Sequence, residues 1–188
     1  MSREAIVIGA SAGAVEALSA ILPALPEGFA LPVLVVVHVP PGRTNALAPL
    51  FRAKCRLPVR EAEDKETIEA GTIYFAPADY HLLVEPDHTL GLSDDPPVLH
   101  SRPSIDVLFE SAADAYGPAL AGVVLTGASA DGAAGLKALA DAGGLALVED
   151  PAGAHSPTMP RAALEACPTA RTAGLSELAS ILIALGDR

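Results

Sequence analysis

The nine residues Ala5–Gly13, AIVIGASAG, decide the fold class of this chain. The apolar run Ala5–Ile8 is typical of a buried strand, and a turn of glycine and other small residues follows it. Apolar residues then recur at helical spacing over 15–25, and Val33–Val37 (VLVVV) is a second continuous apolar run. A run without polar alternation is expected of a parallel strand that is covered on both faces. The stretch therefore predicts a strand–helix–strand unit with parallel strands.

The same alternation of short apolar runs and Ala/Leu-rich helical patterns continues along the chain. Further strands are predicted at 59–62, 72–75, 122–125 and 146–148, and helices at 45–54, 104–116, 132–142, from Pro160 onward and at 175–185. Residues 80–92 indicate a β-hairpin around a Pro-Asp-His turn, and a Pro-rich loop at 93–103 follows it. These elements predict an α/β fold: a doubly wound, mostly parallel, Rossmann-like three-layer sheet with an antiparallel hairpin. Residues 1–188 contain neither a sequence repeat nor a clear linker, so one domain is expected.

The chain is acidic and rich in apolar residues. Hydrophobic residues make up 51%, and 12 basic against 23 acidic residues give a formal net charge of −11. This composition excludes a disordered chain, and the negative charge disfavours nucleic-acid and membrane-surface partners, because it repels phosphate groups. No apolar run reaches the roughly 18 residues of a membrane span, so no membrane insertion is expected. Free thiols and the lack of a clear export signal favour the cytoplasm. Cys55 and Cys167 are too few for a disulfide framework and are expected to pack as free thiols.

Ligands of open parallel sheets bind at the carboxyl ends of the strands, so the residues that follow each predicted strand are candidates for a functional site. After the first strand, Gly9–Gly13 forms a G-x-S-x-G turn whose small residues leave the Ser11 hydroxyl clear of the backbone. The helix that follows offers unpaired N–H groups that suit a developing oxyanion. Ser11 is therefore a candidate nucleophile. The alternative is that its hydroxyl only caps the helix.

An imidazole and a carboxylate follow two other predicted strands. His38 ends the second apolar run, and Asp131 lies in the loop after the strand at 122–125. An imidazole here could take the proton of a neighbouring hydroxyl, and a carboxylate could orient and stabilise the imidazolium. The alternatives are a half-buried histidine bonded to backbone carbonyls and an aspartate that caps the helix beginning at Gly132. Because all three groups fall at one edge of one sheet, together they favour an acyl-transfer site.

Two other motifs fit Gly9–Gly13 less well. A dinucleotide site needs G-x-G-x-x-G, but Ser11 stands at the middle glycine, and no acidic residue follows the second strand. The α/β-hydrolase elbow has the order Ser, acid, His, whereas the order here is Ser11, His38, Asp131. We therefore expect no nicotinamide cofactor. No pair of histidines has metal-ligand spacing such as H-E-x-x-H, so no metal is expected either.

The remaining histidines fall outside this set. His81 and His88 lie in or beside the predicted hairpin and are expected on its exposed face. His100 and His155 lie on predicted loops, where they could touch a substrate.

Six separate segments carry a family resemblance. They are IVIGASAG at 6–13, HVP at 38–40, GTIYFAPADYHLLV at 71–84, HSRPSIDVLFESAA at 100–113, VVLTGASADGAAGLKAL at 123–139 and MPRAAL at 159–164. In this order they resemble the catalytic domain of the CheB-type protein-glutamate methylesterases of bacterial chemotaxis. The resemblance implies removal of methyl groups from γ-glutamyl methyl esters on chemoreceptor helices, and deamidation of particular receptor glutamines.

The resemblance also implies roles for the residues at the strand ends. It implies Ser11 as the nucleophile, His38 as general base and then acid, and Asp131 as the carboxylate that supports the imidazole. The backbone amides of Ala12 and Ala128 are the oxyanion candidates.

The chain departs from the family pattern around these positions. Ala12 and Ala14 stand where the family usually has threonine and glycine, and Ala128 and Ser129 stand where it usually has methionine and glycine. Val39 also replaces a common methionine. Backbone N–H groups survive such changes, but the pocket wall becomes smaller, so these departures bear on rate and on substrate preference.

The resemblance points to a methylated chemoreceptor, or to another signalling protein, as the partner. The nucleophile loop begins at residue 9, so no phosphate-receiver domain is expected on this chain, and control by phosphorylation is expected to be either absent or supplied in trans. Two alternatives stay open, namely a CheB-like scaffold without turnover and an esterase for a small-molecule ester. A docking rim for a glutamate-rich receptor would need basic side chains, and the candidates are Arg43, Arg52, Lys54, Arg56, Arg60 and Arg102.

Overall fold

The computed structural model describes residues 2–39, 42 and 46–186. Its strands are β1 (Ala5–Ala10), β2 (Val33–Val37), β3 (Val59–Glu61), β4 (Ile73–Phe75), β5 (His81–Val84), β6 (Leu90–Ser93), β7 (Leu120–Val124), β8 (Leu145–Glu149) and β9 (Arg171–Ala173). Its α-helices are α1 (Ala14–Ile21), α2 (Leu47–Arg52), α3 (Ile105–Tyr116), α4 (Ala133–Asp141), α5 (Thr158–Ala166) and α6 (Leu175–Gly186). Strands and helices alternate through most of the chain, as predicted.

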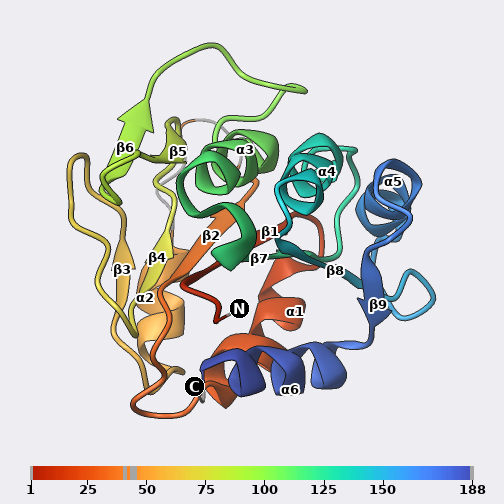
Figure 1. Cartoon of the computed structure of the whole chain (residues 1–188), viewed down its shortest axis with the longest axis horizontal. Helices are drawn as coiled ribbons and strands as arrows, with labels where there is room; N and C mark the ends of the chain where they lie inside the picture. Colours follow the sequence, from red (N-terminus) through yellow and green to blue (C-terminus); the bar gives the residue numbers. More distant parts are fainter. Residues whose placement is uncertain (1, 40–41, 43–45, 187–188) are drawn as a thin grey trace.

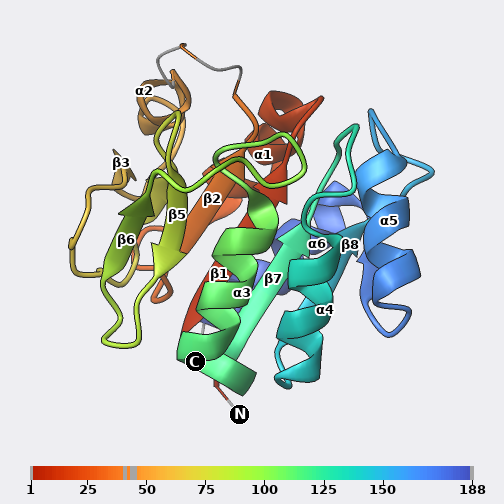
Figure 2. The ribbon, with the colours of Figure 1, turned by 90° about the horizontal axis from the view of Figure 1, so that it is seen from above.

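Seven of these strands form one sheet in the order β3-β4-β2-β1-β7-β8-β9, and every pair in it is parallel. The strands β5 and β6 pair antiparallel in a separate hairpin, which lies near the β3–β4 side of the molecule (Figures 1 and 2). The predicted α/β fold with a mostly parallel sheet and an antiparallel hairpin is therefore confirmed.

Helices cover both faces of the sheet. Successive side chains of a strand point to opposite faces, so an apolar strand contributes to a core on each face. Ile6 and Ile8 of β1 belong to a core that also holds buried side chains of α1, α2 and α6. Val7, on the other face, belongs to a second core with α3, α4 and α5. Figure 1 shows these two sets of helices on opposite sides of the sheet. The continuous apolar runs in the sequence reflect this double burial.

Some boundaries differ from the prediction. The helix predicted at 45–54 is α2, Leu47–Arg52, and Asn45 lies outside the described residues. The helix predicted from Pro160 begins two residues earlier, at Thr158. The edge strand β9 was not predicted, because two of its three residues are exposed and it therefore lacks the apolar run by which buried strands are recognised.

The strand β1 lies between β2 and β7, so the carboxyl ends of these three strands meet at the centre of the sheet. The helix α1 that follows β1 and the helix α4 that follows β7 pack on opposite faces. Chain connections that diverge in this way leave a crevice outside the strand ends, which is where open α/β sheets bind ligands.

Candidate active site

Backbone pairing places Ser11 between the ends of two neighbouring strands. Ala10 is paired with Val37, and the N–H of His38 donates to the carbonyl of Ala10 at 3.2 Å. Ser11 and His38 therefore follow side by side at the ends of β1 and β2. On its other side, the N–H of Ser11 donates to the carbonyl of Thr126, just past β7, at 2.9 Å.

The Ser11 hydroxyl is not used to cap the helix that follows it. The N-cap of α1 is Gly13, whose φ of 84° lies in the left-handed region, and no side chain caps this helix. The Ser11 hydroxyl makes no hydrogen bond with any residue that the structure describes, so it does not cap the helix. A Cβ on Gly13 would lie 2.7 Å from the Cβ of His155, which shows that His155 packs directly over this turn.

His38 and Asp131 are in direct contact. The Nε2 of His38 lies 2.6 Å from Oδ2 of Asp131, and their side chains are 14% and 0% exposed. An ionised carboxylate can only accept a hydrogen bond, so Nε2 carries the proton and Nδ1 keeps its lone pair. His38 is therefore bonded to a carboxylate rather than to backbone carbonyls, and its free lone pair suits a general base.

Asp131 is held by the beginning of α3. Its carboxylate accepts hydrogen bonds from the N–H groups of Ile105 at 2.7 Å and Asp106 at 2.9 Å, and from the hydroxyl of Ser104 at 2.8 Å. The N-cap of its own following helix is Gly132, with φ of 95°. Asp131 thus caps a helix from a distant part of the sequence. Ser104, at the N-cap position of α3, makes no capping hydrogen bond and donates to Asp131 instead.

This environment keeps Asp131 ionised. Burial by itself would raise the pKa of its carboxyl group, but the hydrogen bonds from His38, from the two backbone N–H groups and from Ser104 outweigh burial and lower the pKa. The amino end of α3 also favours a negative charge at this position. A carboxylate that stays charged can stabilise an imidazolium on His38.

The described residues show no hydrogen bond between Ser11 and His38. The two are neighbours through the pairing of β1 with β2, and no described residue bonds to the Nδ1 of His38. Hydrogen bonds of this kind are often long in the absence of substrate and tighten in the complex.

Two backbone N–H groups beside Ser11 are open. Those of Ala12 and Ala128 donate to no described residue, whereas the N–H of Gly127 donates to the carbonyl of Ser156 at 3.1 Å. A Cβ on Gly127 would lie 3.0 Å from the Cβ of Ser11, so the loop after β7 passes close to the nucleophile turn. Both N–H groups are thus available to a developing oxyanion.

Thr126 ties these loops together, a role that was not predicted. Its hydroxyl donates to the carbonyl of Ala12 at 2.8 Å and accepts from the N–H of Ser156 at 2.8 Å. Its own N–H donates to Glu149, a 3% exposed carboxyl group at the end of β8 whose pKa burial raises. The sequence feature that could have revealed this link is a glutamate at the end of a predicted buried strand.

The expectation that His81 lies on an exposed face is wrong. Its side chain is 1% exposed, because the hairpin packs this face against α3. The N–H of Ser104 donates to its Nδ1 at 3.1 Å, so its Nε2 carries the proton and donates to the carbonyl of Pro96, also at 3.1 Å. His81 therefore joins the loop at 93–103 to the residue that binds Asp131.

Four of the basic candidates make separate local contacts. Arg52 donates to the carbonyl of Val59, and Lys54 to the hydroxyl of Ser19. Arg60 pairs with Glu66 and Glu69 near β3, Arg102 donates to carbonyls of its own loop, and Arg43 lies outside the described residues. Among the described residues, none of these contacts involves Ser11, His38 or Asp131.

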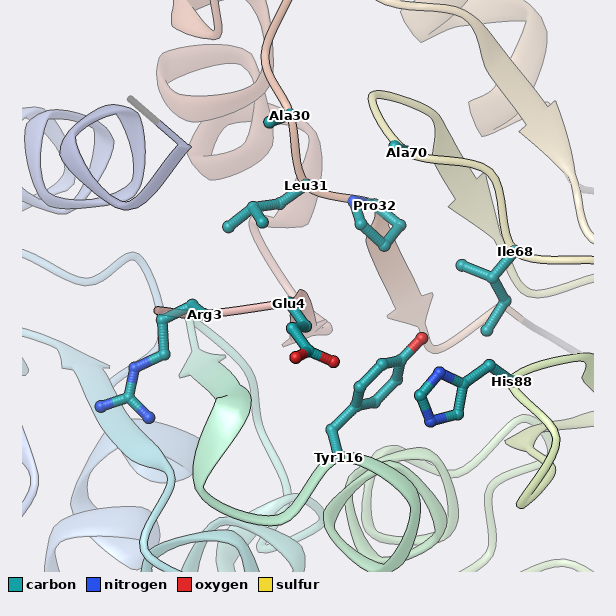
Figure 3. A pocket seen from close by; sticks show the side chains of 9 residues that line it. All are labelled: Arg3, Glu4, Ala30, Leu31, Pro32, Ile68, Ala70, His88 and Tyr116. Carbon is teal, nitrogen blue, oxygen red and sulfur yellow. The ribbon is translucent and has the colours of Figure 1, made fainter. Parts of the chain in front are cut away.

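A cavity of about 340 Å³ lies at the amino ends of the strands, away from the candidate site (Figure 3). Glu4 and Pro32, which precede β1 and β2, line it, together with Tyr116 and His88, whose rings lie 4.4 Å apart. None of the proposed catalytic groups contributes to it. Within the described residues, no cluster of three or more His, Cys, Asp or Glu could hold a metal ion, and no helix is long and apolar enough to span a membrane.

Comparisons with known proteins agree with the resemblance seen in the sequence. The CheB methylesterase family profile matches residues 6–182. A Leptospira interrogans protein, provisionally named protein-glutamate methylesterase/protein-glutamine glutaminase, is 45% identical over 98% of this chain and 96% of its own length. A Paraburkholderia xenovorans protein with the same activities in its name is 40% identical over 100% of this chain, which spans 53% of that relative. The crystal structure of the Thermotoga maritima CheB methylesterase catalytic domain matches with a TM-score of 0.93 and 32% identity, covering 98% of this chain and 100% of that domain.

Proposed function

The chain belongs to the CheB methylesterase family, and from this premise we propose that it is a serine esterase that hydrolyses γ-glutamyl methyl esters of a signalling protein. The observation that supports the proposal most strongly is the 2.6 Å contact between His38 and the buried Asp131, beside the unoccupied hydroxyl of Ser11. Capping of α3 accounts for the buried carboxylate, whereas the bond from His38 to this carboxylate, beside Ser11, is what an activated serine requires.

The first half of the reaction forms an acyl-enzyme. The Oγ of Ser11 attacks the ester carbonyl carbon while Nδ1 of His38 takes its proton, and Asp131 stabilises the imidazolium. The N–H groups of Ala12 and Ala128 hold the negative oxygen of the tetrahedral intermediate. The carbon–oxygen bond to the methoxy group then breaks, and methanol leaves with the proton from His38.

Water completes the cycle. His38 takes a proton from water as the oxygen attacks the acyl carbon, and the bond to Ser11 breaks as the serine regains its proton. The products are a free glutamate side chain and the original enzyme. A glutamine side chain would follow the same path with ammonia as the leaving group, which is the second activity in the names of the relatives.

We propose a methylated chemoreceptor, or a related cytoplasmic signalling protein, as the substrate, with a phosphate-receiver domain acting in trans as a regulator. Release of methanol from methylated receptor, compared with release from short γ-glutamyl methyl esters, separates a protein substrate from a small-molecule one. Release of ammonia from unmodified receptor tests deamidation.

Ser11→Ala is expected to abolish methanol release, because the variant lacks the hydroxyl that forms the acyl-enzyme, and this hydroxyl makes no hydrogen bond among the described residues. Its melting temperature should stay close to that of the unaltered chain. A fluorophosphonate should label the unaltered chain and leave the variant unlabelled. Hydrolysis retained by Ser11→Ala, or an unaltered chain that does not label, would reject the esterase in favour of a scaffold.

A further inference from the structure

Two neighbouring helices exchange buried carboxylates at their amino ends. Asp131, just before α4, accepts the N–H groups of Ile105 and Asp106 at the beginning of α3. In return, Oδ1 of Asp106 accepts the N–H groups of Gly132 at 2.9 Å and Gly135 at 2.7 Å, at the beginning of α4. Each aspartate therefore caps the helix that carries or follows the other.

The two helix ends approach too closely to shift independently. A Cβ on Gly135 would lie 2.6 Å from the Cβ of Phe109 and 3.0 Å from the Cα of Asp106. A Cβ on Gly132 would lie 2.9 Å from Cγ2 of Ile105. Gly132 follows Asp131 directly in the chain. The hydrogen bond that Asp106 accepts from Gly132 therefore fixes the backbone that carries the Asp131 carboxylate, which contacts His38.

We propose that Asp106 is a positioning residue for the esterase reaction, which holds Asp131 in place for His38 and whose negative charge favours the protonated form of His38. The proposal rests on the roles proposed above for His38 and Asp131. Asp106 itself does not touch substrate: it is 6% exposed, and it acts through the backbone of Gly132.

The charge of Asp106 lies in a buried acidic cluster. Burial, followed by the charge of Asp131 and a smaller contribution from Glu110, raises the pKa of Asp106 to about 6, against the opposing hydrogen bonds from Gly135 and Gly132. The other ionisable groups around it are His38, bonded to Asp131, and His81, bonded to Ser104. Negative charge near Asp131 makes a proton on His38 easier to hold.

Asp106→Asn separates charge from geometry. An asparagine carbonyl oxygen can accept the same two N–H groups, and Oδ2 of Asp106 has no described hydrogen-bond partner that its amide would oppose. The plateau kcat should therefore stay within about threefold of the unaltered enzyme. The acidic limb of kcat/KM, which reports loss of neutral His38, should move to lower pH by about half a unit, because the lost charge no longer favours its protonation.

Asp106→Ala removes both acceptor bonds and should lower kcat by about 10–100-fold with little change in KM, since small displacements of a catalytic group have such effects. Asp114→Asn, an exposed carboxylate later on α3, is the control and should leave the kcat/KM profile unchanged. Methanol release from a short γ-glutamyl methyl ester peptide, at pH 5 to about 9, gives these values.

Two results would overturn the proposal. One is an Asp106→Asn profile that overlays the unaltered one. The other is a folded Asp106→Ala variant with full kcat, foldedness being checked by its thermal unfolding. If Asp106→Ala does not fold, the Asp106→Asn profile decides alone. Failure of the proposed function is distinguishable, because the unaltered chain would then release no methanol, or its activity would survive in His38→Ala and Asp131→Ala.

Discussion

At the scale of single residues, Asp106 is expected to lower stability while it supports the site. Its folded pKa of about 6 lies above the usual 3.8, so between these values the folded chain binds more protons than the unfolded chain. Stability therefore falls as the pH rises from about 4 to about 6, and the loss is complete above that range.

Asp106→Asn should consequently raise the free energy of unfolding at pH 8 by about 1–3 kcal/mol, and the gain should shrink toward zero near pH 4. The reason is that asparagine keeps the acceptor oxygen and carries no buried charge. Urea unfolding at a series of pH values measures the difference, and the exposed Asp114→Asn serves as the control. Equal stability of the two chains at pH 8 would contradict the expectation.

Gly127 is a second residue with a measurable role. A Cβ there would lie 2.5 Å from Cε and 2.7 Å from Sδ of Met159, as well as 3.0 Å from the Cβ of Ser11. Gly127→Ala should therefore lower the free energy of unfolding by about 1–3 kcal/mol and reduce kcat, because Ser11 must move. Gly174→Ala, where a Cβ meets nothing within 4 Å, should change neither quantity. An active and fully stable Gly127→Ala variant would contradict this expectation and show that the loop accommodates the methyl group without loss of stability or activity.

The residues at the strand ends could be predicted from the sequence, whereas the residues that hold them in position could not. Ser11, His38 and Asp131 were identifiable because each directly follows a strand that an apolar run marks. The contact of Asp106 with Gly132, and that of His81 with Ser104, join elements that lie far apart in sequence, and no local pattern signals them. In a short amphipathic strand, the sequence pattern does not distinguish a polar residue that becomes buried from one that stays exposed.

At the scale of elements, the hairpin β5–β6 supports the site through the beginning of α3. His81 on β5 accepts from Ser104 and donates to Pro96, so the loop between β6 and α3 is bonded at both of its ends. Ser104 in turn donates to Asp131. The hairpin itself was predictable from its turn, but this link to the carboxylate was not, since it depends on how the hairpin packs on α3.

His81→Leu tests the link. The change leaves the buried N–H of Ser104 without a partner and removes the partly buried bond to the carbonyl of Pro96, which should lower the free energy of unfolding by about 1–3 kcal/mol. The kcat should also fall, because Ser104 orients Asp131. Chemical unfolding and methanol release measure the two effects. His100→Asn, at an exposed position whose φ of 66° asparagine tolerates, should leave both unchanged. A His81→Leu variant that loses stability alone would separate this hairpin from catalysis.

At the scale of the whole molecule, the net charge of −11 should oppose binding of an acidic substrate. Of the basic candidates, four are engaged in separate local contacts, namely Arg52, Lys54, Arg60 and Arg102. Raising the salt concentration shortens the Debye length, which is about 10 Å at 0.1 M, and so weakens the repulsion.

We therefore expect kcat/KM for a glutamate-rich ester peptide to rise between about 20 mM and 200 mM salt. An uncharged ester peptide of the same length is the control and should show little dependence. A fall in kcat/KM for the acidic peptide would instead reveal a basic docking surface that involves residues such as Arg43.

The central position of β1 has a consequence for the order of folding events. Ala5 pairs with Leu120, so the middle of the sheet cannot close until chain segments more than a hundred residues apart have met. Closing such long loops slows folding, because their entropy is lost before the contacts that stabilise them form. Esterase activity should therefore return last during refolding from denaturant, after helical circular dichroism, and the interval between the two signals would time the final closure of the sheet.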